Sequence, residues 1–370
     1  MAQPPVLTLR ALNRTLLARQ LLLERSKMAP VTALEHLVGF QAQNPWSPYH
    51  ALHARLREFD PLVLSGHVER REAVRMVLMR GTIHLVTTAD AAALRPVVQP
   101  VLDRELFSTT TWGKGVEGVD LVPVLAMARE LVEERPRSLA ELREAIAARW
   151  PDRNAASLAY AARNLLPTVQ VTPRGLWGKS GAVKLTTLDH WTGVAPAHDA
   201  SPDAAVMRYL RVFGPATVGD VAAWSRLTGM REPLERLRPQ LRTFRDEKGR
   251  ELFDVPDAPI LTGEEPAPVR LLPDYDNALL SHQDRSRIFT ALDWPNWGDN
   301  VTAPVYLVDG FVAGIWKPRG KGAATVIELT PLVPLDPAER RAVEEEASGL
   351  LAMLEPAADP GALRWLSPAG

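Results

Sequence analysis

The sequence contains no cysteine among its 370 residues. Without thiols the chain cannot form disulfides, bind an iron–sulfur cluster or hold zinc through thiolates. It also lacks an apolar run near the roughly 18 to 20 residues of a membrane-spanning helix. Its first ten residues lack the basic start and apolar core of a signal peptide. These absences predict a cytoplasmic protein without membrane contact.

Several motifs of catalysis are missing as well. There is no phosphate-binding loop and no dinucleotide fingerprint, and the histidines show no helical zinc-binding pair with an accompanying glutamate. No Gly-x-Ser-x-Gly turn precedes Ser281, which argues against a serine hydrolase. The neighbouring carboxylates Asp274 and Asp276 are expected to cap local structure. The sequence therefore predicts neither a metal nor a cofactor.

The charge is nearly balanced, at −1, but unevenly distributed. Residues 1–118 carry 14 Lys and Arg against 10 Asp and Glu, whereas residues 266–370 carry 9 against 14. The balance argues against a protein that coats nucleic acid indiscriminately. It still permits a basic surface on one side, and the preference for arginine, 36 against 7 lysines, suits planar phosphate contacts.

Apolar periodicity predicts one plan repeated three times, in which three helices are followed by a two-stranded hairpin. This is the order of a winged helix. The predicted fold is helix-rich α+β, with winged helices at 1–118, 119–200 and 201–265, a β-hairpin and helix at 266–355, and a loose tail at 356–370. The expected helices are 9–24, 31–40, one after Pro48, 121–134, 139–150, 155–166, 203–213, 218–227, 232–241 and 337–354. The expected strands are 73–79, 82–87, 169–172, 182–187, 242–245, 251–255, 269–272, 305–308, 311–316 and 325–329.

Tandem winged helices indicate nucleic-acid binding, although such modules also bind proteins. The expected third helix of the second repeat has Arg163 as its one cation, which makes it a poor sequence-reading helix. The basic residues predicted to contact DNA phosphates are Arg80, Arg174, Lys179, Lys317, Arg319 and Lys321. Trp46 is expected to stack on DNA or to staple two helices together. His84 is expected either to face DNA or to be structural.

The most informative motif is Gln41-Ala42-Gln43, placed by the periodicity at the mouth of a helix. Glutamine does not titrate, so neither side chain can act as a conventional general base. Together they offer four amide donors and two carbonyl acceptors. Such a pair could hold a water molecule or read the edge of a base.

Four motifs in this order resemble a known family. They are Gln41-Ala42-Gln43, LMRGTIHL at 78–85, TPRGLWG at 172–178 and LPDYDNALLSH at 272–282. They resemble the bacterial winged-helix DNA glycosylases of the azinomycin-resistance type over about residues 8–355. The resemblance implies three winged helices around a concave DNA-binding channel. It also implies excision of bulky N7-alkylpurines, possible unhooking of interstrand crosslinks, and catalysis by Gln41 and Gln43 in the Gln-x-Gln branch of the family.

The expected protein is thus a monomeric, monofunctional DNA glycosylase that protects its host against a DNA-alkylating natural product. Its expected partner is double-stranded DNA with alkylated or crosslinked purines. Two alternatives remain open from the sequence. A winged-helix transcriptional regulator would bind one sequence without catalysis, and a toxin-sequestering protein would bind the free drug.

Overall fold

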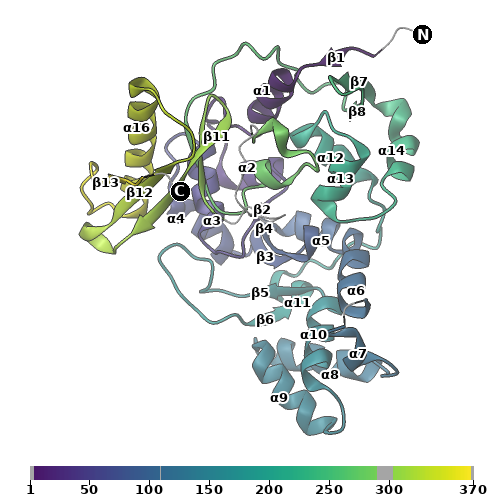
Figure 1. Ribbon diagram of the computed structural model, residues 1–370. Coiled ribbons are helices and arrows are strands. Elements are labelled where there is room, and N and C mark those ends of the chain that lie inside the picture. The colour runs from purple at the N-terminus through teal and green to yellow at the C-terminus, as the bar shows by residue number, and fades with distance from the viewer. Residues whose placement is uncertain (1–3, 109, 290–302, 368–370) are drawn as a thin grey trace.

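The computed structural model describes residues 4–108, 110–289 and 303–367 as a helix-rich α+β protein. A five-stranded sheet lies at its centre, in the order β2 (Phe40–Gln41), β4 (Ile83–Thr87), β3 (Ala73–Val77), β5 (Thr168–Gln170) and β6 (Leu185–Thr187), with all neighbours antiparallel. The predicted hairpins of residues 1–118 and 119–200 therefore share one sheet (Figure 1).

The described part of the N-terminal segment contains the helices α1 (Leu9–Arg19), α2 (Pro30–His36), α3 (Ser47–Arg55), α4 (Pro61–Glu69), α5 (Thr88–Val97), α6 (Gln99–Phe107) and α7 (Gly113–Val116). Of these, α2, α3, α4 and α5 contact this sheet. The three helices predicted for this segment are present as α1, α2 and α3. The helices α4, α5, α6 and α7 were not predicted. The helix expected at 9–24 ends at Arg19, and the chain then turns at Leu21, which has a φ of 58°.

The helix expected at 31–40 also ends early, and this corrects the placement of the glutamine motif. Val38 and Gly39 both adopt positive φ angles, which turn the chain from α2 into β2. Gly39 is required there because a Cβ atom would lie 2.3 Å from Cγ1 of Val86. Gln41 consequently lies on a short strand and not at the mouth of a helix.

The second segment follows its prediction closely. It contains α8 (Val122–Glu134), α9 (Leu139–Arg149) and α10 (Ala155–Leu165), which pack around a small core of their own. Ser138 and Glu141 form the predicted capping box at the start of α9. These helices project from one end of the molecule, below β5 and β6 in Figure 1. The short helix α11 (Leu188–Thr192) follows β6.

The third segment comprises α12 (Asp203–Phe213), α13 (Val218–Ser225) and α14 (Arg231–Leu237), followed by the hairpin β7 (Arg242–Asp246) and β8 (Glu251–Asp254). Thr217 caps α13 as predicted, with Asp220 completing the box. β1 (Val6–Leu7) was not predicted and pairs parallel with β7. The main hydrophobic core runs without a break from the N-terminal helices through α12 and α13 to β10.

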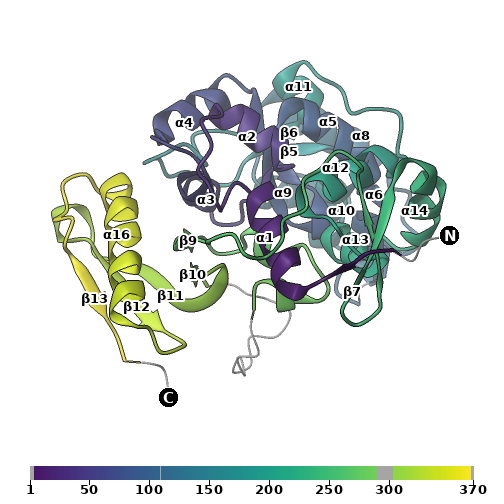
Figure 2. The same cartoon turned by 90° about the horizontal axis from the view of Figure 1, so that it is seen from above.

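The C-terminal region forms a second five-stranded sheet in the order β13-β12-β11-β10-β9. Its strands are β9 (Arg270–Leu272), β10 (Val305–Val308), β11 (Phe311–Arg319), β12 (Val326–Pro331) and β13 (Leu363–Trp365), with α16 (Pro337–Leu354) packed on the sheet. Figure 2 shows this layer beside the body of the protein. The bounds of α16 and β10 agree with the predicted ones.

The tail at 356–370 is not loose throughout, which corrects that expectation. β13 pairs parallel with β12, and Nε1 of Trp365 donates to Oε1 of Glu344 at 2.7 Å. The guanidinium of Arg340 lies 4.1 Å from the centre of the Trp365 ring. Aromatic packing therefore holds this segment despite its Pro-, Gly- and Ala-rich composition. Residues 368–370 lie outside the described residues. None of the described helices is long and apolar enough to span a bilayer.

Buried histidines predict that the fold loses stability in mild acid. Burial lowers the pKa of His50 and of His84 to about 3 and that of His53 to about 4, and it also lowers the pKa of His282. Unfolded histidines titrate near 6.5, so between about pH 6.5 and pH 4 the unfolded state binds protons that the folded state does not. Each such proton lowers the unfolding free energy by about 1.4 kcal/mol per pH unit.

We therefore expect urea unfolding to show a loss of at least about 2 kcal/mol between pH 6.5 and pH 5.5. The matched control is His198→Gln, which removes a histidine from an exposed position instead of a buried one. An unfolding free energy that stays constant across this window would contradict the burial of neutral histidines.

Candidate active site

The glutamine motif begins in β2, and hydrogen bonds to its middle residue, Ala42, fix its backbone. The N–H of Ala42 donates to the carbonyl of Ile83 at 2.7 Å, and Nη2 of Arg75 donates to the carbonyl of Ala42 at 2.7 Å. Ala42 is fully buried, and side chains alternate along an extended chain. Gln41 and Gln43 therefore point to the opposite side from Ala42, into a cleft.

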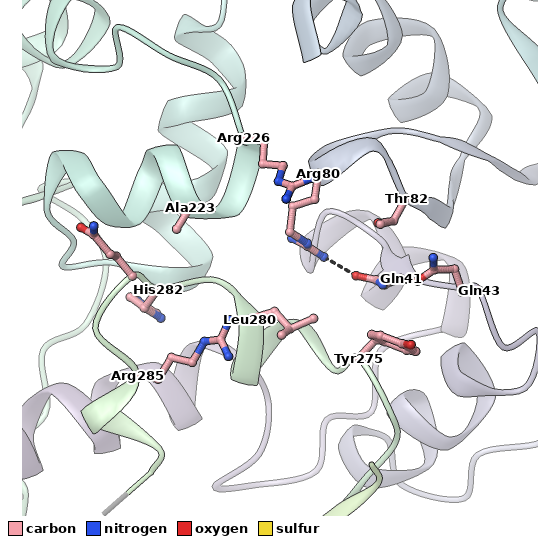
Figure 3. Close-up of a pocket in the computed structure, with 11 residues that line it drawn as sticks. Gln41, Gln43, Arg80, Thr82, Ala223, Arg226, Tyr275, Leu280, His282 and Arg285 are labelled. Atoms are coloured by element: carbon pink, nitrogen blue, oxygen red, sulfur yellow. Dashed lines mark hydrogen bonds between the residues drawn. The ribbon is translucent and has the colours of Figure 1, made fainter. Parts of the chain in front are cut away.

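The cleft has a volume of about 680 Å³ and collects residues from three distant parts of the chain. Figure 3 shows the two glutamines side by side, with Arg80 reaching Gln41 and Tyr275 across from the pair. The described residues that line the cleft are Gln41, Gln43, Arg80, Thr82, Ala223, Arg226, Tyr275, Leu280, His282, Gln283 and Arg285. None of these carries a carboxylate.

The two glutamine amides contact each other and differ in exposure. Nε2 of Gln41 donates to Oε1 of Gln43 at 2.5 Å, while Oε1 of Gln41 accepts from Nη2 of Arg80 at 2.8 Å. Gln41 is 4% exposed, and Gln43 is exposed to the cleft. A bound substrate thus meets the amide of Gln43 first.

Arg80 is positioned by its backbone as well as by its hydrogen bonds. It follows β3 with a φ of 60°, a left-handed conformation that is uncommon outside glycine. Its guanidinium donates to the carbonyl of Trp224 at 3.1 Å and to Oδ1 of Asn277 at 3.2 Å. Burial, followed by the charges of Arg226 and Arg285, lowers the pKa of Arg80 to about 10. Arg80 therefore stays cationic at neutral pH.

His84 lies behind Arg80, and its expected role changes accordingly. It is fully buried, its Nδ1 contacts the carbonyl of Thr82 at 3.0 Å, and its Nε2 lies 3.3 Å from Nη2 of Arg80. Burial and the charge of Arg80 lower its pKa to about 3, so the ring is neutral. A neutral ring with a proton on Nδ1 accepts from Arg80 through Nε2. His84 supports the cleft from within, so we no longer expect it to contact DNA.

Residues 274–277 connect the cleft to the core. Asp276 caps α15 (Asn277–Leu280), as expected from the sequence, and forms a fully buried ion pair with Arg55. Asp274 accepts from Asn44 and from Ser47, and burial raises the pKa of Asp274. Nδ2 of Asn277 donates to the carbonyl of Gly39 at 2.8 Å. Asp274 and Asp276 thus fix the loop and do not face the cleft as reacting groups.

The other predicted DNA contacts lie outside the residues that line the cleft. Trp46 packs edge-on against Trp177, with ring centres 5.5 Å apart, which favours the stapling role over stacking on DNA. Nη1 of Arg174 donates to the carbonyl of Gly181 at 3.2 Å. The exposed cations are Lys179, Lys317, Arg319 and Lys321, of which Arg319 pairs with Glu328 at 3.0 Å. Phosphate contacts by these residues stay predictions.

The sequence analysis assigned no role in the site to several residues of the cleft, among them Arg226, Arg285 and Tyr275. Arg226 and Arg285 add two guanidinium groups near Arg80, and nothing local in the sequence marked them. Tyr275 adopts a φ of 58°, which is rare for a bulky residue. Its place in the 272–282 motif was the one available signal. Three arginines without a carboxylate give a cleft suited to an anion such as a DNA phosphate. No described group of three or more His, Asp and Glu side chains could hold a metal ion.

Comparison with known proteins gives a consistent result. The family model described as "DNA glycosylase AlkZ-like" matches residues 34–353. Among solved structures, the DNA glycosylase AlkZ of Streptomyces sahachiroi superposes with a TM-score of 0.76 at 19% sequence identity, covering 98% of this chain and 100% of that one. At this identity the superposition shows a shared fold. No curated protein matches the sequence significantly.

Proposed function

Since the chain belongs to the AlkZ-like DNA glycosylase family, it is a DNA N-glycosylase, and we propose that it excises bulky N7-alkylpurines through Gln41 and Gln43. The observation that carries the proposal is a cleft with two amides and three arginines but, among its described lining residues, no carboxylate. Most glycoside-hydrolysing sites use a carboxylic acid to protonate the leaving group. The described lining of this cleft offers none.

An N7-alkylated purine removes the need for that acid. Its ring already carries a positive charge, so the bond between C1′ of the sugar and N9 breaks with its electron pair moving to the purine. The sugar develops oxocarbenium character, and a water molecule adds to C1′ and releases its proton to solvent. Neutral amides can hold and orient this water. Arg226 and Arg285 hold the flanking phosphates at the cleft.

The shape of the cleft supports a bulky substrate. At about 680 Å³ it is far larger than a purine base requires, and it opens between β2, α13 and the loop before α15. A lesion tethered to both strands cannot swing fully out of the duplex. An open cleft could admit such a lesion while it remains within the duplex. This supports the proposal that the protein unhooks interstrand crosslinks and gives resistance to a DNA-alkylating natural product.

The DNA path follows from the proposed division of the chain. Residues 1–118, 119–200 and 201–265 would act as tandem winged helices around a channel, with residues 266–355 adding the β11–β12 hairpin and α16. The cations Arg174, Lys179, Lys317, Arg319 and Lys321 would contact phosphates along this path. We expect one monomer per lesion.

The decisive test is a gel-resolved excision assay on a duplex with a single N7-alkylguanine. We expect the wild-type protein to leave an abasic site and the Gln41→Ala/Gln43→Ala double variant to leave none. A matched duplex with uracil should stay intact, because uracil is an uncharged leaving group and the described residues of the cleft supply no acid. Equal release of uracil, or equal activity of the double variant, would contradict the proposal.

A further inference from the structure

The glutamine pair and Arg80 form a chain of hydrogen bonds that has a direction. Arg80 donates to Gln41, and Gln41 donates to Gln43. A guanidinium carries only donors, so the atom of Gln41 that faces Arg80 must be the carbonyl Oε1. The NH₂ group of Gln41 is then turned toward Gln43, whose facing atom must be the carbonyl Oε1.

Because of this direction, the two glutamines differ in the hydrogen-bond donors and acceptors that remain free for a ligand in the cleft. The carbonyl of Gln41 accepts from Arg80, its amide donates to Gln43, and its side chain is nearly fully buried. Gln43 keeps one lone pair on Oε1 and its whole NH₂ group for the cleft. A nucleophilic water must donate a proton and keep a lone pair for the sugar, so it needs an acceptor. Gln43 Oε1 is the acceptor of the pair that the cleft can reach.

Resting on the proposed function, we propose that Arg80 is a positioning residue that sets the amide orientation of Gln43 through Gln41. Gln43 then holds the attacking water, while Gln41 transmits the orientation. Removal of Arg80 lets both amides rotate by 180°, which turns the NH₂ group of Gln43 toward Gln41. The water is then held in only part of the population, or at a different place.

The surroundings of Arg80 fit a positioning role. Its guanidinium is shared among acceptors from three elements, namely Trp224 of α13, Asn277 of α15 and His84 of β4. Its shortest contact is the one to Gln41. Among the described residues no carboxylate pairs with it, so its direction is set by neutral acceptors alone. Gly81, next in the chain, keeps a positive φ where a Cβ would lie 2.6 Å from Oε2 of Glu105.

The competing role for Arg80 is a direct phosphate contact, and the two roles predict different measurements. Loss of a phosphate contact weakens DNA binding and reduces the salt dependence of the dissociation constant by about one ion. Loss of a positioning residue lowers the rate of the chemical step and leaves the affinity for lesion DNA and its salt dependence unchanged.

The first experiment measures Arg80→Met under single-turnover conditions on the N7-alkylguanine duplex. We expect the excision rate to fall roughly 10- to 100-fold, as for loss of one hydrogen bond from a charged donor. The dissociation constant and its salt dependence should stay as in the wild type. A weakened affinity with an unchanged single-turnover rate would overturn the proposal in favour of the phosphate role.

The second experiment uses the symmetry of a carboxylate. In the Gln43→Glu variant both oxygens of the side chain accept, so no orientation has to be set. We expect this variant to retain excision, and Arg80→Met in its background to cost less than about threefold, because the orienting function is no longer needed. A merely structural Arg80 would cost the same in both backgrounds. Inactivity of Gln43→Glu, or equal costs in both backgrounds, would overturn the proposal.

A third variant covers the case in which Arg80→Met fails to fold. Gln41→Leu removes the middle member of the hydrogen-bond series from Arg80 through Gln41 to Gln43, and it leaves Arg80 in place. It should lower the rate at least tenfold with Gln43 present and less than about threefold in the Gln43→Glu background; equal losses would overturn the inference. Failure of the proposed function looks different, since the wild-type protein itself would then leave the N7-alkylguanine duplex intact.

Discussion

Replacing Gln43 by alanine is expected to lower the single-turnover rate of N7-alkylguanine excision by about 100- to 1,000-fold. This corresponds to roughly 3 to 4 kcal/mol of transition-state stabilisation, the range seen when one preorganised polar group is removed from a site. The physical reason is that Gln43 offers the exposed acceptor of the pair, and no described carboxylate lines the cleft to replace it. The dissociation constant for lesion DNA should change little.

The matched control is Gln240→Ala, which removes the same amide from an exposed position outside the cleft. We expect this variant to excise at the wild-type rate. A Gln43→Ala rate within about threefold of wild type would contradict the catalytic role of the motif. The reaction would then depend on the arginines and on the intrinsic weakness of the bond alone.

Replacing Asp276 by alanine is expected to lower the unfolding free energy by about 3 to 5 kcal/mol. Arg55 and Asp276 are both fully buried, with Nη1 to Oδ2 at 2.8 Å and Nη2 to Oδ1 at 2.7 Å. Removal of the carboxylate leaves a guanidinium without its counter-charge in the core, where it lies 5.2 Å from the centre of the Phe40 ring. The same change removes the cap of α15.

Urea unfolding measures this effect, and Asp257→Ala is its control. Asp257 forms the same kind of pair with Arg211 at 2.7 Å, but both side chains are exposed, so its loss should change the unfolding free energy far less. Similar losses for the two variants would contradict the burial argument. Because Asn277 follows Asp276 and binds Arg80, we also expect Asp276→Ala to slow excision at temperatures where it remains folded.

Residues close in sequence determined much of the local structure. The spacing of apolar residues predicted α12 and α16 with the bounds that the structure shows, and Ser138 and Thr217 marked the starts of α9 and α13. A cap and an amphipathic face depend on neighbours within one or two turns of a helix, which a sequence displays directly.

The places where the sequence-based predictions were wrong share a physical cause. β13 forms only because β12 offers an edge and Glu344 accepts from Trp365. Likewise, residues 38–41 continue from a helical pattern, yet Val86 leaves room only for a glycine at position 39. In both places a distant partner overrides the local preference.

In the candidate site, too, some features could be predicted from the sequence and others depend on the tertiary structure. The sequence by itself supplied the candidate groups, because the motif Gln41-Ala42-Gln43 is part of the family resemblance, and that resemblance implies catalysis by two neutral amides. Only the tertiary structure decided how those amides are oriented. Arg80 meets Gln41 because β2 and β4 pair, and Asn277 meets Arg80 across about 200 residues of chain. Hydrogen-bond direction depends on which atoms the fold brings together, and that information is not local.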